Sequence, residues 1–386
     1  MTPAFQKNTW IEIDLGILSR NIRSLRQALA HTTATVFVVK SNAYGHGLIP
    51  VSRCAWECGV RWFAVVHMDE ALALRALLPG ANVLILSAIE PSQVAQAIEA
   101  ELTPVLVSEN QAVSLAAAAA ALGRPLTCHL KIDTGMGRLG ILWRDAISAI
   151  PRLAQQPGLR IRGICTHFAS AGSEDGGFTE EQSERFRRAV RACEAARLTG
   201  LFRHASNSGA ILSGADRDLD GVRPGILLYG YGPRVTIRRQ GPADTAAQTV
   251  ETQPFLQWKT RIVQVKKVPA GFPVGYDSTY VTPRETGIAT LDVGYADGYA
   301  RLLGNRAEVI IRGRRCPVVG LVTMNLITVD LGPACEAGDG DEAVLLGRQG
   351  DASIWADEMA RWRSTIPYEV LTNIHTSEIR VTGAAL

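Results

Sequence analysis

A lysine that ends a short apolar segment is the first residue with evident chemical potential. Val36-Phe37-Val38-Val39 precede Lys40, and the chain then breaks at Gly45 and Gly47. The segment does not alternate polar and apolar residues, which predicts a strand buried on both faces of a parallel sheet. Lys40 would lie at the carboxyl edge of that sheet, where ligands bind in parallel α/β folds. Desolvation there would favour the neutral amine and make Lys40 a candidate nucleophile or base, although the segment alone favours a lysine that extends to water.

Strand and helix patterns alternate around this lysine over the first part of the chain. Strands are predicted at residues 36–39, 62–66, 82–86, 104–107, 128–132, 161–166 and 201–205, with a short eighth at 219–223. Amphipathic helical patterns lie between them, including 17–29, 69–78, 91–100, 108–122 and 179–198. Eight strands, each paired with a helix, in about 225 residues predict a (β/α)8 TIM barrel.

Polar side chains follow the predicted strands at their carboxyl ends. Lys131 and the glycine-broken turn 133–138 follow the fifth strand, and His167 follows the sixth. The run 204–209 follows the seventh strand, and Arg223-Pro224-Gly225 follows the eighth. Since the carboxyl ends of barrel strands meet at one face, these groups are expected to gather there. The last two turns could form an anion cup from backbone N–H groups, although each is a weak signal alone.

A second region with a different pattern begins near residue 239. The turn-prone stretch 238–244 suits a linker. Beyond it, short strands are predicted at 256–268, 286–293, 308–311, 317–331 and 342–346, with one helix at 353–363. We therefore expect a barrel domain over residues 12–238 and a mainly β domain over residues 239–386. The opening strand, from Thr9 to Ile13, could join either domain.

Three segments resemble the alanine racemases, a family of enzymes that use pyridoxal 5'-phosphate (PLP). Residues 39–47 match the lysine segment of that family, with Ser41 in place of its usual alanine. Residues 223–230 match its Arg-x-Gly-Ile-x-Leu-Tyr-Gly pattern, and residues 293–299 match a tyrosine segment. The resemblance extends from Trp10 to Leu371 with the motifs in family order. It implies PLP as the cofactor, alanine as the substrate and a homodimer with shared active sites.

The resemblance also assigns the contacts to PLP. It implies that Lys40 forms an aldimine with the cofactor and that Arg223 faces the pyridine nitrogen. An arginine does not give up its proton, so it would leave that nitrogen neutral and limit side reactions. In this family the phosphate would be held by Tyr44, Ser208, Gly225, Ile226 and Tyr368.

A two-base racemisation follows from the same resemblance. Lys40 would serve one face of the substrate α-carbon, and Tyr295 of the partner subunit would serve the other. A free tyrosine has a pKa of about 10 and needs support, which His167, backed by the arginine, would give. Arg138 and the backbone N–H of Met324 would receive the substrate carboxylate or support the phenolic oxygen of the cofactor. Lys131, which is often carbamylated in the family, would steady that arginine.

Departures from the family pattern keep other specificities open. Leu321 and Asn325 stand where most members have arginine and aspartate, and Gly172 replaces an acidic residue. A serine or broad-spectrum racemase is therefore an alternative, although Tyr368 would narrow the pocket beside the substrate side chain and favours alanine. A non-catalytic PLP-binding protein would resemble the N-terminal half only. A barrel decarboxylase fits the arginine and tyrosine motifs poorly.

Composition narrows the class of protein and its setting. The chain is 47% hydrophobic and 20% charged with a net charge of +3, as is typical of a soluble globular protein, and no basic stripe suggests nucleic-acid binding. It begins without a signal-peptide core, and it lacks an apolar run of about 18 residues, so we expect no membrane contact. These features suit a cytoplasmic protein, and the family resemblance implies that it supplies D-alanine for peptidoglycan. The seven cysteines are mostly scattered, so reduced thiols and no metal site are expected.

Overall fold

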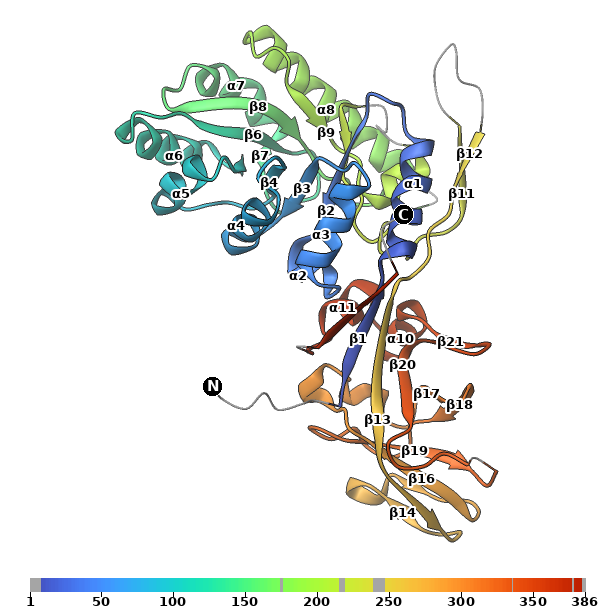
Figure 1. The fold of residues 1–386 in the computed structure, drawn as a ribbon. Coiled ribbons are helices and arrows are strands. Elements are labelled where there is room, and N and C mark those ends of the chain that lie inside the picture. The colour runs from blue at the N-terminus through green and yellow to red at the C-terminus, as the bar shows by residue number, and fades with distance from the viewer. Residues whose placement is uncertain are drawn as a thin grey trace.

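The barrel predicted from the sequence closes in the structure. The computed structural model describes residues 8–173, 176–214, 219–238, 247–334, 336–376 and 378–383. Eight parallel strands pair in a ring, and β10 pairs with β2 to close it (Figure 1). They are β2 (Ala34–Val38), β3 (Trp62–Val65), β4 (Asn82–Ile85), β5 (Thr103–Leu106), β6 (Leu126–Asp133), β8 (Leu159–Cys165), β9 (Phe202–His204) and β10 (Gly221–Val222). The run from Val36 to Val39, which forms the end of β2 and the residue after it, is buried, as its uninterrupted apolar character predicted.

Helices surround the barrel at the positions that the amphipathic patterns indicate. They are α1 (Leu15–Ala28), α3 (Leu48–Glu57), α4 (Met68–Leu77), α5 (Val94–Glu99), α6 (Glu109–Ala121), α7 (Trp143–Ala154), α8 (Gly177–Ala195) and α9 (Ser208–Ser213). Local side chains begin several of them. The carboxylate of Asp14 accepts a hydrogen bond from the Ile17 N–H at the start of α1, and Ser108 caps α6 in the same way.

The second domain is built on one long strand. β13 (Leu256–Val268) pairs with β16 (Thr286–Leu291) and β20 (Glu342–Gln349), and β16 pairs with β19 (Ile327–Gly332). The sheet also holds β17 (Glu308–Ile311), β18 (Arg314–Pro317) and β21 (Ala352–Ile354), and the helices α10 (Ala356–Arg363) and α11 (Pro367–Thr372) follow it in the chain. The predicted single strand over 317–331 is wrong. It is two strands, because Gly320 takes a φ of +75° and Thr323 closes a turn on Leu326.

The opening strand belongs to this second sheet. β1 (Trp10–Asp14) pairs antiparallel with β13 and parallel with β22 (Ile379–Thr382), so the first and last strands of the chain lie side by side in this sheet (Figure 1). Between the domains, β11 (Val235–Arg238) pairs with β12 (Ala247–Val250). Most of the predicted linker, residues 239–244, lies outside the described residues, and the domain boundaries remain a prediction.

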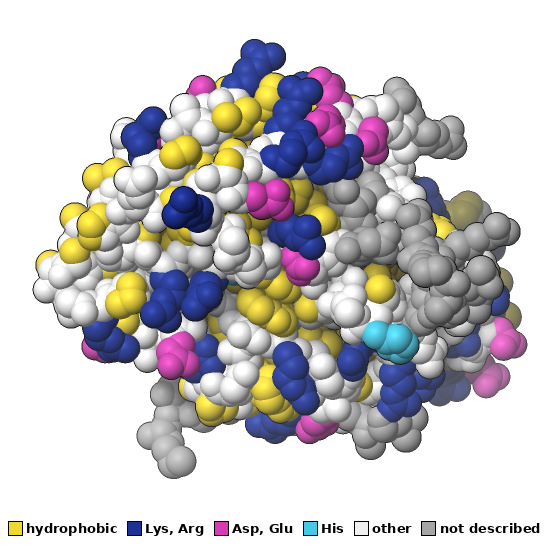
Figure 2. Space-filling view, turned by 90° about the horizontal axis from the view of Figure 1, so that it is seen from above, with side chains coloured by type: hydrophobic (Ala, Val, Ile, Leu, Met, Phe, Trp, Pro, Cys, Tyr) yellow, Lys and Arg dark blue, Asp and Glu magenta, His cyan; other side chains and the backbone are white. Residues whose placement is uncertain are grey.

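The surface carries both signs of charge. On the face in Figure 2, basic side chains intermingle with acidic and apolar ones, and no stripe of one sign crosses it. Among the residues that the structure describes, no helix combines the length and the apolar character that crossing a bilayer requires. The six described cysteines are free thiols, and Cys335 lies outside the described residues.

Candidate active site

A strained turn places Lys40 at the mouth of the barrel. The segment labelled α2 (Lys40–Tyr44) follows β2, and the four residues after Lys40 all have a φ between 52° and 54°. This left-handed conformation costs roughly 1–2 kcal/mol for each residue that has a Cβ. Surrounding bonds must hold it. The N–H of Asn42 donates to Glu70 Oε1 at 3.0 Å, and the Asn42 side chain accepts from the Leu48 N–H at 2.8 Å.

Close packing against the second domain also holds this turn. A Cβ on Gly45 would lie 2.4 Å from the carbonyl oxygen of Leu371 in α11, so only glycine allows the approach. The ring of Tyr44 stacks on Tyr229 with 4.6 Å between ring centroids. The turn is therefore over-determined, a condition under which strained backbone persists at functional sites.

One cavity of about 750 Å³ collects most of the predicted site residues. Those that line it are Lys40, Tyr44, Lys131, Arg138, His167, Ser208, Arg223, Gly225 and Tyr368. Ile226 is buried beside Gly225 but does not line the cavity. The residues come from the carboxyl ends of strands β2, β6, β8, β9 and β10 and from α11. The structure thus brings together groups that are up to 328 positions apart in the chain, since residue 368 lies beside residue 40.

The guanidinium of Arg223 is fixed by the barrel wall. Nη2 donates to the carbonyl oxygens of Thr166 at 2.6 Å and Ala205 at 2.8 Å, and Nη1 donates to His204 Nδ1 at 2.7 Å. Nη2 also lies 3.4 Å from Nδ1 of His167, which can only accept this bond. Among the described residues, the Nε–H of Arg223 and the second hydrogen of Nη1 have no acceptor, so these are the donors left for a ligand.

A small anion cradle lies across the cavity from the lysine. The hydroxyl oxygen of Ser208 accepts the N–H of Gly225 at 3.1 Å and the N–H of Leu227 at 3.3 Å, which leaves its own hydrogen free to donate outward. A Cβ on Gly225 would lie 2.6 Å from the hydroxyl of Tyr44, so glycine is required there. Within the described part of the chain, the N–H of Ile226 has no acceptor. Such converging donors suit a phosphate.

Burial and neighbouring cations favour the neutral form of the basic groups. Burial, and then the charge of Arg138, lower the pKa of Lys40. Burial is also the main reason that the pKa of Lys131 falls to about 8. His167 titrates at a pKa of about 2, because burial and the charge of Arg223 both oppose its protonation. A neutral lysine amine is a nucleophile, so the cavity favours covalent chemistry at Lys40.

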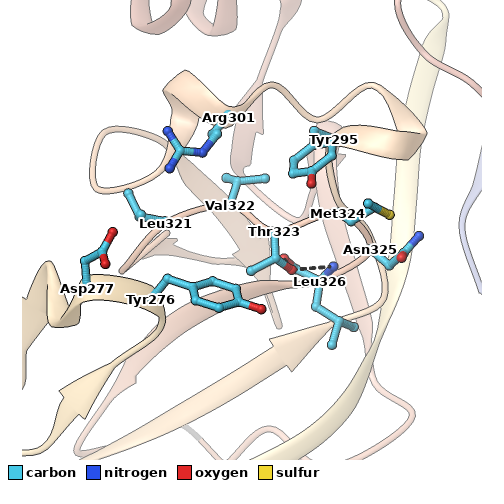
Figure 3. Close-up of a pocket in the computed structure, with 10 residues that line it drawn as sticks. All are labelled: Tyr276, Asp277, Tyr295, Arg301, Leu321, Val322, Thr323, Met324, Asn325 and Leu326. Carbon is cyan, nitrogen blue, oxygen red and sulfur yellow. Dashed lines mark hydrogen bonds between the residues drawn. The ribbon is translucent and has the colours of Figure 1, made fainter.

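Tyr295 and Met324 lie elsewhere, on the second domain. They line a separate hollow of about 540 Å³ with Tyr276, Asp277, Arg301, Leu321, Val322, Thr323, Asn325 and Leu326. Figure 3 shows the rings of Tyr276 and Tyr295 bordering this hollow. We call the part formed by Tyr276, Tyr295 and Met324 the tyrosine surface. These three side chains are 70%, 44% and 56% exposed. Within one chain, neither predicted residue reaches the barrel cavity.

The sequence reasoning missed Tyr276. It is the most exposed of the large hydrophobic side chains that the structure describes, and it stands on a turn where Asp277 and Ser278 have φ values of 58° and 47°. The signal in the sequence was the turn-prone run Gly275-Tyr276-Asp277-Ser278, which carries an aromatic residue where a polar one is usual. Strained backbone under an exposed aromatic ring indicates a functional surface.

Comparison with known proteins gives the family. A family model described as alanine racemase, N-terminal domain, matches residues 13–233, and one described as alanine racemase, C-terminal domain, matches residues 255–382. The chain belongs to the alanine racemase family. An alanine racemase from Syntrophobacter fumaroxidans is 41% identical over 367 residues, which cover 95% of each chain. The predicted family and the predicted barrel followed by a β domain are confirmed.

Solved alanine racemases have the same fold. The crystal structure from Bacillus anthracis with bound L-Ala-P has a TM-score of 0.88 at 32% identity, covering 99% of this chain and 97% of that chain. The structure from Bartonella henselae with covalently bound pyridoxal phosphate has a TM-score of 0.83 at 27% identity, covering 97% and 99%. The departures from the family pattern divide between two places. Gly172 lines the barrel cavity, whereas Leu321 and Asn325 lie by the tyrosine surface.

Proposed function

We propose that this protein is a PLP-dependent alanine racemase that interconverts L- and D-alanine in the cytoplasm and so supplies D-alanine for peptidoglycan. The observation that carries the proposal is that a desolvated lysine, a phosphate-sized cradle and a fixed arginine line one cavity. PLP needs these three partners from a protein: an amine, a phosphate site and a group at its ring nitrogen.

The residues present fit PLP. Ser208, Gly225 and the N–H of Ile226 would hold the phosphate, with the hydroxyls of Tyr44 and Tyr368 beside them, and Lys40 would bind the aldehyde carbon. The Nε–H of Arg223 is a donor available to the ring nitrogen. When bound, the cofactor withdraws electrons from the α-carbon of an amino acid and so acidifies its α-hydrogen.

Lys40 would act as the base on one face of the substrate. Its pKa is lowered by burial and by Arg138, so its amine can take the α-hydrogen near neutral pH. Arg223 has a different task. As a permanent donor tied to Thr166 and Ala205, it holds its end of the cofactor without accepting a proton.

The opposite face of the substrate α-carbon needs a second base. In this proposal, the tyrosine surface of the partner subunit supplies it. The sequence predicts Tyr295 for this role. Tyr295 lines the exposed hollow of the second domain, so we propose that its phenol enters the partner's cavity, with Tyr276 beside it on the same hollow. Either phenol would approach His167, whose Nε2 carries its hydrogen because Nδ1 accepts from Arg223.

Substrate recognition would combine both subunits. Arg138 from the barrel and the backbone N–H of Met324 from the tyrosine surface are proposed to receive the substrate carboxylate. Lys131, with a pKa of about 8, keeps enough neutral amine to react with CO2, which would form a carbamate and release a proton. That anion would offset the charge of Arg138 and fix it in place.

Pocket size supports alanine as the substrate, with serine as the second candidate. The ring of Tyr368 lies 5.8 Å from that of Tyr44, which narrows the cavity beside the lysine. Leu321 and Asn325 keep serine as an alternative substrate. They stand where most family members have arginine and aspartate, so one positive and one negative charge are absent from the part of the site that the tyrosine surface contributes. Turnover of L-alanine and L-serine on one preparation, followed as D-product, tests the choice. We expect alanine to give the larger kcat/KM, and equal or greater serine turnover would contradict this.

Covalent capture gives a separate test of the cofactor. Borohydride reduction of the purified yellow protein is expected to fix PLP to Lys40, as read by peptide mass spectrometry. Labelling of a different lysine, or the absence of PLP, would contradict the proposal.

A further inference from the structure

Two buried histidines inside the barrel have no part in the reaction described above. His129 on β6 is 1% exposed, and His204 at the end of β9 is fully buried. Barrel interiors are usually filled by branched aliphatic side chains. An imidazole in such a place loses its contacts with water, and this loss is recovered only if its nitrogens form hydrogen bonds. Both nitrogens of His204 form such bonds, and the bonds lead to Arg223.

The donor and acceptor roles in the hydrogen bonds of the two histidines are fixed by Arg223. Nη1 of Arg223 donates to Nδ1 of His204 at 2.7 Å, because a guanidinium has no acceptor. Neutral His204 must therefore carry its hydrogen on Nε2. That Nε2 lies 2.9 Å from Nδ1 of His129, to which it donates. His129 in turn must carry its hydrogen on Nε2, so the tautomers of both rings are fixed by the arginine.

The packing of the barrel fixes the ring of His129. His129 lies opposite Gly163 of β8, and a Cβ on Gly163 would lie 2.6 Å from three atoms of the ring. The rings of Phe202 and Trp62 stack at 4.4 Å and cover the pair, with Phe202 at 5.3 Å from His204 and 6.0 Å from His129. Only glycine at 163 leaves the room that this ring occupies.

We infer that His129 is a positioning residue for Arg223, acting through His204, and this inference rests on the function proposed above. Without an acceptor at His129, the Nε2–H of His204 would be buried without a partner. Moving that hydrogen to Nδ1 would set a donor against the Nη1–H of Arg223. The first arrangement leaves a buried donor unpaired, which favours the second. In the second, the guanidinium loses an anchor, and its Nε–H is no longer held toward the ring nitrogen of the cofactor.

Three variants separate this role from packing. His129→Leu removes the acceptor at similar volume. His129→Asn keeps an acceptor oxygen close to the position of Nδ1. Phe202→Leu disturbs the same layer of the barrel without removing a hydrogen bond, so it is the matched control.

The tautomer of His204 is the readout that needs no cofactor. In PLP-free protein with ¹⁵N-labelled histidine, long-range NMR correlations are expected to show hydrogen on Nε2 of His204 in the parent, in His129→Asn and in Phe202→Leu. His129→Leu is expected to shift His204 to the other tautomer or to a mixture. In the PLP-loaded protein, His129→Leu should lower kcat about tenfold with little change in KM, and should shift the visible band, while His129→Asn restores both.

The outcomes are distinct. An unchanged tautomer and unchanged kcat in His129→Leu would overturn the inference, and so would an equal loss of kcat in Phe202→Leu. If the parent protein neither binds PLP nor racemises alanine, the proposed function fails instead. The tautomer of His204 in the PLP-free variants still decides the hydrogen-bond relay in that case.

Discussion

The cavity at the barrel mouth and the tyrosine surface differ in how firmly their side chains are held. In the cavity, Arg223 is 4% exposed and its Nη groups are bound by two carbonyls and an imidazole. Lys40 precedes four left-handed residues that are held by side chains and by α11. On the tyrosine surface, by contrast, Tyr276 and Tyr295 are exposed, and neither hydroxyl forms a hydrogen bond with another described residue.

This difference indicates separate tasks for the barrel cavity and the tyrosine surface. A cavity that must orient a cofactor benefits from groups fixed in advance. In the proposed dimer, the tyrosine surface would complete a neighbour's cavity, so its side chains would find their partners on another chain. In the proposed mechanism, the cavity supplies one base and the tyrosine surface supplies the other. The account therefore makes different predictions for variants in the two regions.

The largest effect is expected in the cavity. Lys40→Ala removes both the amine that binds the cofactor and one base, so racemisation should fall by more than about 10³-fold and the covalent visible band should vanish. The exposed lysine variant Lys267→Ala is the matched control and should keep both. A yellow, active Lys40→Ala protein would contradict the assignment.

Loss of a phenol on the tyrosine surface should spare the cofactor and affect one direction. Tyr295→Phe is expected to keep the visible band and to lower racemisation by about 10²-fold, because one proton transfer lacks its base. Exchange of the α-hydrogen with solvent deuterium should stop for one enantiomer of alanine and continue for the other. Tyr276→Phe should have a smaller effect. The reverse ranking would give the role of base to Tyr276.

A smaller effect is expected on the pH dependence of the free energy of unfolding, to which a buried histidine of the barrel should contribute. His46 is fully buried beside Tyr44, its Nε2 has no hydrogen-bond partner among the described residues, and burial lowers its pKa to about 4. The unfolded chain binds this proton near pH 6.5, so the stabilisation from neutral His46 is present above that pH and is lost as the pH falls toward 4. The free energy of unfolding should fall by about 1.4 kcal/mol per pH unit for each such histidine.

Urea unfolding between pH 7.5 and 5 measures this slope. His46→Leu should reduce it by about 1 kcal/mol per pH unit, whatever the variant does to stability at pH 7.5. His375→Leu is the control, since this histidine of the second domain is exposed, and it should leave the slope unchanged. Equal slopes in the parent and His46→Leu would show that the buried ring is not the source of acid sensitivity.

Much of the barrel could be predicted because its signals are local. The apolar run before Lys40, the glycine after Arg223 and the amphipathic helices each depend on neighbours in the sequence. The residues that the motifs named mostly line one cavity in the structure, although their roles remain predictions. β11, β12 and β22 were not predicted, since each is four residues long and is defined by its partner strand rather than by its own pattern.

Other features depended on contacts that the sequence does not display. The sequence from Ser41 to Tyr44 does not predict a left-handed backbone. That conformation is sterically unfavourable for serine, alanine and tyrosine, and of the four residues only Asn42 adopts it readily. The approach of His129 to His204 depends on the stagger of β6, β8 and β9. Tyr276 lies on a turn whose role is visible only once its exposure is known.

The most direct test of the shared site uses two inactive variants in one dimer. Lys40→Ala and Tyr295→Ala chains with different tags are co-expressed, and the mixed dimer is purified through both tags. One of its two cavities then receives a lysine and a phenol, both unaltered, so about half of the parent activity is predicted. An active site built from two chains would be contradicted if the mixed dimer were as inactive as the two variant homodimers. An active Lys40→Ala homodimer would contradict it as well.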